Sequence, residues 1–336
     1  MSPPAGGPAC MINMPSFTWR KLGHLFGPES SLAPRWMHTH AQTPSVLQKK
    51  DCLRIFFCTR PPADSAGLFV SLIGYVDVEL DNLFQIIRVS QTPVLDLGQR
   101  GSFDEFGTNP VSVIATENRD VRAYYAGWTR CESVPINAAI GVAVSHDNGD
   151  SFARLGPGPV VSYSLDEPFV IGSPKVRRFN NTWFLHYAVG QRWLKLHGRA
   201  EPVYRIRCAT SCDGIVWNKE GRDIISLRLG ADECQAGADI IEFKGLFHMF
   251  FSYRQAVDFR NKDRGYRIGY AVSKDMWNWT RSDSSAGIGV SPAGWDSEMV
   301  SYAHVFHWNE TLYMLYQGND VGRSGFGLAV LDSYEA

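Results

Sequence analysis

Short runs of alternating apolar and polar residues, separated by tight turns, extend along almost the whole chain. Gly107–Gly127 shows the unit most clearly, with an apolar strand, a polar turn, and a second strand that ends in Tyr-Tyr-Ala-Gly. Alternation with a period of two is typical of β-strands, whereas amphipathic helices repeat every 3.6 residues. Because no helix-period segment of normal length stands out, the sequence predicts an all-β protein.

The two-strand unit recurs five times and is followed each time by outer strands. The entry positions of the five units are 64 to 66 residues apart and are held by Pro44, Pro110, Pro174, Ala238 and Ala303. A steady period of this size is the signature of repeated supersecondary units, and four-stranded sheets repeated radially form a β-propeller. We therefore predict a five-bladed β-propeller of four-stranded antiparallel blades. A pair of β-sandwich domains is the alternative, but it explains the even period poorly.

The predicted domain covers residues 36–336 and follows an N-terminal extension, residues 1–35, which is rich in Pro and Gly. The last apolar stretch, Gly325–Leu331, begins a fifth outer pair that lacks its second strand. We expect the N-terminal segment to supply this missing strand and to close the ring.

Composition narrows the class of partner. The net charge of −1 favours neither nucleic acid nor an anionic membrane surface, and there is no apolar run long enough for a membrane span. Seven scattered cysteines do not resemble a disulfide framework, and the N-terminus is not a convincing secretory signal. We expect a cytoplasmic protein with a small-molecule or oligosaccharide substrate, without a cofactor and without an essential metal.

One turn motif is specific. Ser145–Phe152 is similar to the Ser-x-Asp-x-Gly-x-x-aromatic box of sialidase-like propellers. In such a box the Asp accepts hydrogen bonds from its own turn and the Gly permits a positive φ. The adjacent Ser, His and Asp are interpreted as this turn, because the members of a catalytic triad meet in space and not in sequence.

Acidic residues recur in the loops that enter the first strand of four units. In a propeller these first strands line the central channel, so we expect the acids to converge on one axis. Like charges that crowd together raise one another's pKa, which yields the protonated acid and ionised base that glycoside hydrolysis requires. The alternative is that the acids cap turns and bind backbone amides. The four acidic loops are Phe103–Phe106, Leu165–Pro168, Ala231–Cys234 and Trp295–Glu298.

The segment Asp232–Ile240, followed by a Phe-rich strand, resembles the Glu-Cys-Pro-Asp segment of glycoside hydrolase family 32. The whole five-unit pattern resembles the propeller shared by families 32, 43, 68, 117 and 130. This resemblance implies a carbohydrate-active enzyme with Glu233 as general acid, although Gln235–Gly237 replaces the family Pro.

The first unit departs from families 32 and 43, which place an essential Asp at its entrance. This chain has His38 and His40 there. We therefore predict Asp104 as the base or nucleophile, and Asp296 or Glu298 as a residue that tunes a pKa or holds a sugar hydroxyl.

Further candidates for substrate binding lie near the entrances and ends of the inner strands. Arginine offers a bidentate fork to a carboxylate or phosphate, and Trp and Tyr offer flat faces to sugar rings. His304 lies on a presumed channel strand, where some family 43 members hold a cation through a His. The candidates are His40, Gln42, Arg60, Glu105, Asn109, Trp128, Asp166, Arg254, Glu298, Tyr302 and His304.

Three hypotheses for function follow. The first is a glycoside hydrolase or transferase, the second is a phosphorylase as in family 130, and the third is a propeller that binds or converts a biosynthetic intermediate by other acid–base chemistry. The first requires His40, Asp104, Glu233 and Asp296 to meet in one pocket, with Asp166 at its rim.

Overall fold

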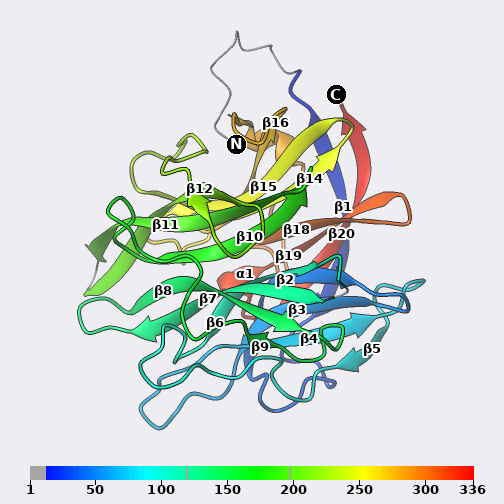
Figure 1. The fold of residues 1–336 in the computed structure, drawn as a ribbon. Helices are drawn as coiled ribbons and strands as arrows, with labels where there is room; N and C mark the ends of the chain where they lie inside the picture. The colour runs from blue at the N-terminus through cyan, green and yellow to red at the C-terminus, as the bar shows by residue number, and fades with distance from the viewer. Residues whose placement is uncertain (1–12, 119, 197) are drawn as a thin grey trace.

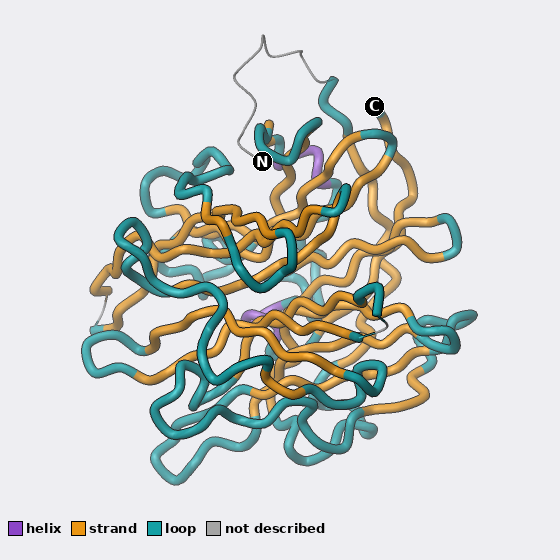
Figure 2. Tube along the Cα trace, in the orientation of Figure 1, coloured by secondary structure: helices purple, strands orange, loops and turns teal. Residues whose placement is uncertain are grey.

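Five four-stranded antiparallel sheets surround a central axis (Figure 1). The structure is a computed structural model and describes residues 13–336 apart from residues 119 and 197. Strands dominate, and the helical segments are one 3₁₀ turn, η1 (Asp283–Ala286), and one short α1 (Asn319–Gly322) (Figure 2). The predicted five-bladed propeller is confirmed.

The first four blades each run outward from the axis in sequence order. Blade 1 consists of β2 (Thr39–Gln48), β3 (Leu53–Arg60), β4 (Leu72–Val78) and β5 (Ile86–Val89). Blade 2 consists of β6 (Thr108–Ala115), β7 (Val121–Arg130), β8 (Ile136–Ser145) and β9 (Ala153–Arg154). Blade 3 consists of β10 (Ile171–Phe179), β11 (Thr182–Leu196), β12 (Arg199–Ser211) and β13 (Asn218–Lys219). Blade 4 consists of β14 (Glu233–Phe243), β15 (Leu246–Gln255), β16 (Arg267–Ser273) and β17 (Thr280–Arg281).

Blade 5 joins the two ends of the described chain. Its inner strands are β18 (Ser301–Trp308), β19 (Thr311–Gln317) and β20 (Phe326–Glu335), and its outermost strand is β1 (Ser16–Phe26). β1 pairs antiparallel with β20 from Ser16 opposite Glu335 to Phe26 opposite Phe326, and the two strands run side by side in Figure 1. The missing strand is therefore supplied from within the predicted extension, and the ring closes through hydrogen bonds between the first and last strands.

The hydrophobic core is divided into layers between neighbouring blades. The layer between blades 1 and 2 contains Phe56 and Tyr75 from one blade and Val113 and Tyr125 from the other. The layer between blades 4 and 5 contains Phe17 of β1, whose ring lies 5.1 Å from that of Phe250. Every blade thus buries both faces, which explains why the inner strands are apolar on both sides.

The Ser145–Phe152 box forms the turn that its sequence predicts. Asp147 Oδ1 accepts hydrogen bonds from the Ser145 hydroxyl at 2.6 Å and from the Asp150 and Ser151 amides at 3.0 and 2.9 Å. These bonds lower the pKa of Asp147 to about 2, although partial burial opposes the shift. All of the hydrogen bonds of this carboxylate serve the turn, so the box has a structural role.

Within the described part of the chain, no helix is long and apolar enough to cross a membrane. The six cysteines at described positions are free thiols.

Candidate functional site

One acid of the entry loop in each of blades 2 to 5 faces the outermost strand of its own blade. In blades 2, 3 and 5 one buried carboxylate accepts a hydrogen bond from a Tyr on the second strand and pairs with a cation on the outermost strand. We call this arrangement the carboxylate clamp. Its members are Asp104 with Tyr125 (2.9 Å) and Arg154 (2.7 Å), Glu167 with Tyr187 (3.0 Å) and Lys219 (2.6 Å), and Asp296 with Tyr316 (3.1 Å) and Lys21 (2.6 Å).

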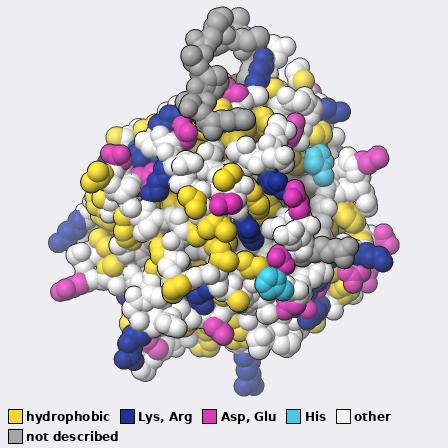
Figure 3. All heavy atoms as spheres, viewed as in Figure 1, with side chains coloured by type: hydrophobic (Ala, Val, Ile, Leu, Met, Phe, Trp, Pro, Cys, Tyr) yellow, Lys and Arg dark blue, Asp and Glu magenta, His cyan; other side chains and the backbone are white. Residues whose placement is uncertain are grey.

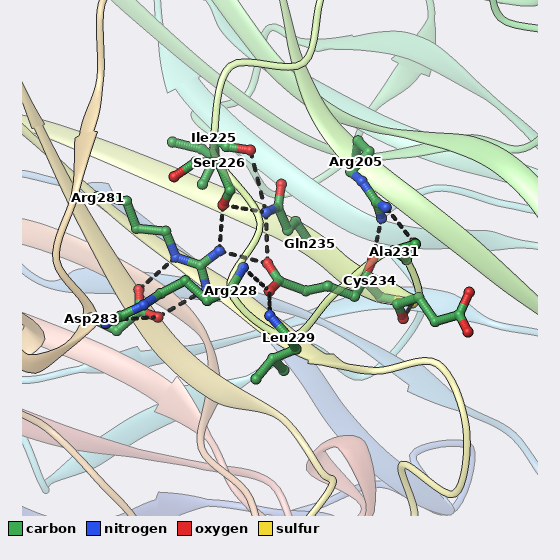
Figure 4. Close-up of polar contacts among 12 residues, drawn as sticks. Arg205, Ile225, Ser226, Arg228, Leu229, Ala231, Cys234, Gln235, Arg281 and Asp283 are labelled. Carbon is green, nitrogen blue, oxygen red and sulfur yellow. Dashed lines mark hydrogen bonds and ion pairs between the residues drawn. The ribbon is translucent and has the colours of Figure 1, made fainter.

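Blade 4 has the same clamp without the tyrosine. Glu233 is fully buried, and its Oε1 accepts hydrogen bonds from Arg281 at 2.6 Å and from Gln235 at 2.7 Å. Its Oε2 accepts from the backbone amides of Arg228 and Leu229 at 2.8 and 2.7 Å. In Figure 4 the side chains of Arg281 and Gln235 and the backbone N–H of Leu229 face the same carboxylate. Burial opposes ionisation, but the four hydrogen bonds outweigh it and hold the pKa of Glu233 below its ordinary value.

The strand register identifies the equivalent residues of the other blades. Tyr125 lies opposite Gly141 of β8, and its counterpart in blade 4 is Phe251, opposite Gly269. In blade 1 the counterpart is Phe57, opposite Gly74, and a methyl group added to Gly74 would meet Met37 at 2.6 Å. Met37 and Phe57 belong to one buried hydrophobic cluster, so apolar packing takes the place of the carboxylate clamp in blade 1.

The predicted convergence of His40, Asp104, Glu233 and Asp296 in one pocket is not met. The three carboxylates are at most 3% exposed, each pairs with a cation of its own blade, and none lines the cavity at the channel mouth. The physical reason is that each side chain faces the outermost strand of its blade instead of the axis. The carboxylate clamps tie the entry loops to the outer strands, so they hold the funnel walls in place.

A cavity of about 240 Å³ does open at the channel mouth, where the inner strands begin. Aromatic side chains form much of its wall. Trp128 donates from its indole N–H to the Ser71 hydroxyl at 2.7 Å, and its ring lies 5.7 Å from that of Phe69. We call this cavity the funnel, and its lining includes Arg60, Phe69, Asn109, Trp128, Tyr204 and Tyr302. None of the described residues that line it is acidic.

Arg60 is the cation of the funnel. Its guanidinium lies 4.1 Å from the centre of the Phe69 ring, and its Nε is buried without a hydrogen-bond partner. Burial lowers the pKa of Arg60 to about 10, and Arg323 nearby adds to the shift. Among the described residues no carboxylate forms an ion pair with it. A partly buried cation without a counterion is costly and favours an anionic ligand.

His40 lies beside this cation. Its backbone N–H donates to the Arg323 carbonyl at 3.2 Å, and its Nδ1 lies 3.0 Å from the Thr39 hydroxyl. Burial lowers the pKa of His40 to about 3, and Arg60 and Arg323 add to the shift. His40 is therefore neutral at neutral pH and can accept or donate a hydrogen bond.

The floor of the funnel joins blades 1 and 2. Asn109 Nδ2 donates to Gln42 Oε1 at 3.2 Å, and Gln42 in turn donates to the Val321 carbonyl. The Oδ1 of Asn109 is buried and has no partner among the described residues. The floor thus offers a free acceptor close to the arginine, a combination that suits a ligand with both hydroxyl and anionic groups.

Arg254 supports the opposite wall. It is 3% exposed, lies 3.7 Å from the centre of the Phe259 ring, and donates from Nε to the Tyr204 hydroxyl at 3.3 Å. The hydroxyls of Tyr204 and Tyr266 hydrogen-bond to each other. Burial raises the pKa of Tyr204 well above its ordinary value, so its hydroxyl stays protonated and available as a donor.

Of the predicted binding residues, Arg60, Asn109, Trp128 and Tyr302 line the funnel, His40, Gln42 and Arg254 contact residues around it, and the remaining four have partners or positions elsewhere. Glu105 accepts from the Gly101 amide at 2.8 Å, and Asp166 is exposed. Glu298 is half-buried and is fixed through its backbone, which accepts from Arg267 at 2.8 Å. His304 is buried on the axis and lines the opposite mouth of the channel.

A ring of polar side chains, one from each blade, closes the channel below the funnel. The Ser45, Ser112, Asp239 and His304 side chains each accept a hydrogen bond from a backbone amide of the next blade, at 2.7 to 3.1 Å. The fifth member, Lys175, lies 3.5 Å from His304, and burial lowers its pKa to about 8. Within the described residues no cluster of His, Cys, Asp and Glu is arranged to hold a metal ion. The ring therefore links neighbouring blades through hydrogen bonds at the axis.

Sequence reasoning missed Phe69 and Arg323, both of which lie in loops between strands. The signal for Phe69 was an aromatic residue within a long polar and glycine-containing loop, and it is 38% exposed. Arg323 had no distinguishing pattern.

Comparison with known proteins identifies relatives over nearly the full length. The chain is 34% identical over 316 residues to "Uncharacterized protein Rv1502" of Mycobacterium tuberculosis strain H37Rv, covering 94% of this chain and 99% of that protein. "Uncharacterized protein MT1551" of strain CDC 1551 matches over the same length with the same identity. No family model matches the chain.

Several solved structures with the same fold are described as glycoside hydrolases. A structure described as "Glycoside hydrolase" superposes with a TM-score of 0.73 and 16% identity, covering 94% of this chain and 92% of that one. A family 130 structure, described among mannoside phosphorylases and hydrolases that target β-1,2 mannosidic linkages in Candida mannan, gives 0.69 and 14%, with 95% of both chains covered. A thermostable family 43 glycoside hydrolase gives 0.61 and 15%, covering 87% and 88%. The protein therefore belongs to the family of Rv1502 and MT1551 and has the five-bladed propeller fold of the glycoside hydrolases.

Proposed function

We propose that the protein is a carbohydrate-active enzyme whose funnel binds a sugar together with a phosphate group, and that phosphate, not water, is the partner in cleavage or formation of the glycosidic bond. The observation that carries the proposal is Arg60, a partly buried cation that lines the funnel without a carboxylate partner. Its planar fork matches the geometry of a phosphate. Arg323 and neutral His40 lie next to it and supply further positive charge and hydrogen bonding.

The rest of the funnel suits a sugar. Trp128 and Tyr302 present aromatic faces and Asn109 presents a free amide oxygen. The hydroxyls of Tyr204 and Tyr302 stay protonated, because burial raises the pKa of each well above its ordinary value.

The positions of the acidic side chains are more compatible with phosphorolysis than with hydrolysis. Hydrolysis requires two carboxyl groups that flank the scissile bond, and the candidates Asp104, Glu233 and Asp296 are all held in carboxylate clamps. In phosphorolysis the glycosidic C–O bond breaks, the anomeric carbon bonds to a phosphate oxygen, and the proton carried by the phosphate ends on the leaving hydroxyl. The reaction thus balances without a second carboxylate.

The test combines binding and turnover. Inorganic phosphate is titrated into the protein by isothermal calorimetry, and a panel of oligosaccharides is incubated with and without phosphate while sugar phosphates are detected by mass spectrometry. We expect phosphate-dependent product and a loss of phosphate affinity of about tenfold or more in Arg60→Gln, because hydrogen bonds to charged groups contribute about 1.5–3 kcal/mol.

Arg20→Gln is the matched control, because Arg20 is an exposed arginine on the outermost strand of blade 5. Arg60→Gln should leave the unliganded protein about as stable as the wild type, since the side chain has no ion pair to lose. Product formation that does not depend on phosphate, or unchanged phosphate affinity in Arg60→Gln, would reject the proposal.

A further inference from the structure

A second cavity opens beside the funnel, next to the loop that joins β7 to β8 and the first residues of β12. Its volume is about 610 Å³. Phe69, Ile136 and Pro202 line both this cavity and the funnel, so the two spaces adjoin at these residues. We call the second cavity the side groove. Its apolar lining includes Phe69, Val134, Ile136, Trp193, Ala200 and Pro202, and its polar lining includes Glu132, Ser133, Arg199, Glu201 and Arg260.

We infer that the side groove binds an aliphatic chain, so that the substrate is an amphiphilic carbohydrate whose sugar and phosphate lie in the funnel. This inference rests on the proposed function for the position of the phosphate. It adds the substrate class: a glycolipid or lipid-linked sugar with an alkyl, acyl or prenyl group.

Phe69 is the residue that connects the two halves of such a ligand. One face of its ring carries the Arg60 guanidinium at 4.1 Å, and the Trp128 ring lies 5.7 Å away. The same ring lines the side groove and is 38% exposed. Its backbone carbonyl accepts a hydrogen bond from Arg130 at 2.8 Å, which fixes the loop that presents it. A phosphate bound at Arg60 would therefore have an apolar surface immediately beside it.

The side chains at the junction between the funnel and the side groove are apolar and cannot form hydrogen bonds with a ligand. The three shared residues are Phe69, Ile136 and Pro202, and none of their side chains can bond a sugar hydroxyl. At the margin, Glu201 is already paired with Arg260 at 2.8 Å. A sugar ring at the junction would lose hydrogen bonds to water without replacing them, whereas a methylene chain gains from burial.

Hydrophobic side chains gather across the middle of the face seen in Figure 3, and charged side chains lie around its margin. Exposed apolar surface that is contiguous and rimmed by polar residues is typical of binding grooves.

The test compares methyl phosphate with butyl and octyl phosphate, each below its micelle concentration, by isothermal calorimetry on the full chain. Each buried methylene should raise affinity roughly fourfold. We therefore expect octyl phosphate to bind at least about 50-fold more tightly than methyl phosphate, since three buried methylenes suffice for this difference.

Two variants separate the inference from the proposed function. Trp193→Ala removes part of an apolar wall that belongs to the side groove and not to the funnel, and it should weaken the dependence on chain length while methyl phosphate still binds. Arg60→Gln should weaken all members of the series together. Val216→Ala is the matched control, because Val216 is 67% exposed and lies in the β12–β13 turn. If Trp193→Ala fails to fold, Val134→Asn tests the same groove.

The possible results are distinct. Equal affinity for methyl and octyl phosphate in the wild-type protein would overturn the side-groove inference and leave the phosphate site standing. No binding of any member would overturn both. A chain-length dependence that survives both Trp193→Ala and Val134→Asn would place the aliphatic chain elsewhere and also overturn the inference.

Discussion

Glu233→Gln separates a structural acid from a catalytic one. The wild-type carboxylate accepts four hydrogen bonds at 2.6 to 2.8 Å, two on each oxygen. The amide of Gln can accept on one oxygen alone, and its NH₂ group faces donors whichever way it is turned. Two hydrogen bonds are therefore lost inside a fully buried site.

The magnitude follows from these contacts. Hydrogen bonds to a charged group contribute about 1.5–3 kcal/mol each, and removing one member of a buried ion pair costs about 3–5 kcal/mol. Arg281 keeps two hydrogen bonds to Asp283, both at 2.9 Å, so it is not left without a counterion and the lower end applies. We expect a loss of about 3–4 kcal/mol in the free energy of unfolding. At about 2.1 cal/mol/K per residue over 336 residues, this loss lowers Tm by about 5 °C.

The assay is chemical denaturation and calorimetry of wild type, Glu233→Gln and the exposed control Glu29→Gln. The folded-state pKa of Glu233 is lowered, so its contribution to stability is present above about pH 4.3, the unfolded value, and is lost as pH falls toward the folded pKa. The stability difference between wild type and Glu233→Gln should therefore shrink below about pH 4.

Binding in the funnel provides the second readout. Phosphate affinity should be unchanged in Glu233→Gln, because the carboxylate does not line the cavity. The reasoning is refuted if Glu233→Gln is as stable as the control but loses turnover, since that outcome would place Glu233 at the reacting bond.

Two further predictions concern β1, the strand that closes the ring, and His40. Phe17→Ala should lower the free energy of unfolding by about 3–5 kcal/mol, because the ring is 3% exposed and lies between blades 4 and 5. The control Leu32→Ala, at a site 51% exposed, should change the free energy of unfolding little. Equal effects of the two substitutions would contradict the role of β1 in closing the ring. His40 should remain neutral from pH 8 down to about pH 4, because its pKa is lowered to about 3. An NMR titration measures this, with the His40 signal assigned by comparison with His40→Asn. A titration midpoint near 6.5 would contradict the buried, cationic surroundings of His40.

The fold could be predicted because each blade repeats the same local pattern. Five units at a constant interval define five blades, and counting strands in the last unit predicts that an N-terminal strand closes it. Both features depend on the order of strands along the chain, which the alternation of apolar and polar residues encodes directly.

The carboxylate clamps could not be predicted for a physical reason. Their cations Arg154, Lys219 and Arg281 lie in outermost strands of two residues, too short to produce a periodic signal. In blade 5 the cation is Lys21, which lies 275 positions from Asp296. The direction of each acid depends on these partners, and neighbouring positions on a strand face opposite sides.

Several funnel residues could be predicted, because the ends of the second strands lie at the channel mouth. Arg60 and Trp128 were chosen on this ground and both line the funnel. Phe69 and Arg323 come from loops, whose paths depend on tertiary contacts such as the hydrogen bond from Arg130 to the Phe69 carbonyl.

The acids and the funnel together show how repetition bears on function in a propeller. A residue type that recurs at one position of most repeats is explained first by a structural need that those repeats share, and here blades 2 to 5 share a tie between the entry loop and the outermost strand. Function in a ring of similar units instead requires differences between them, because a ligand on the axis must meet unequal walls to be held in one orientation. Blade 1 lacks the carboxylate clamp and contributes His40 and Arg60, while blades 2 and 3 contribute the side groove. In this molecule the residues that differ between blades line the funnel and the side groove, whereas the repeated acids lie outside both cavities.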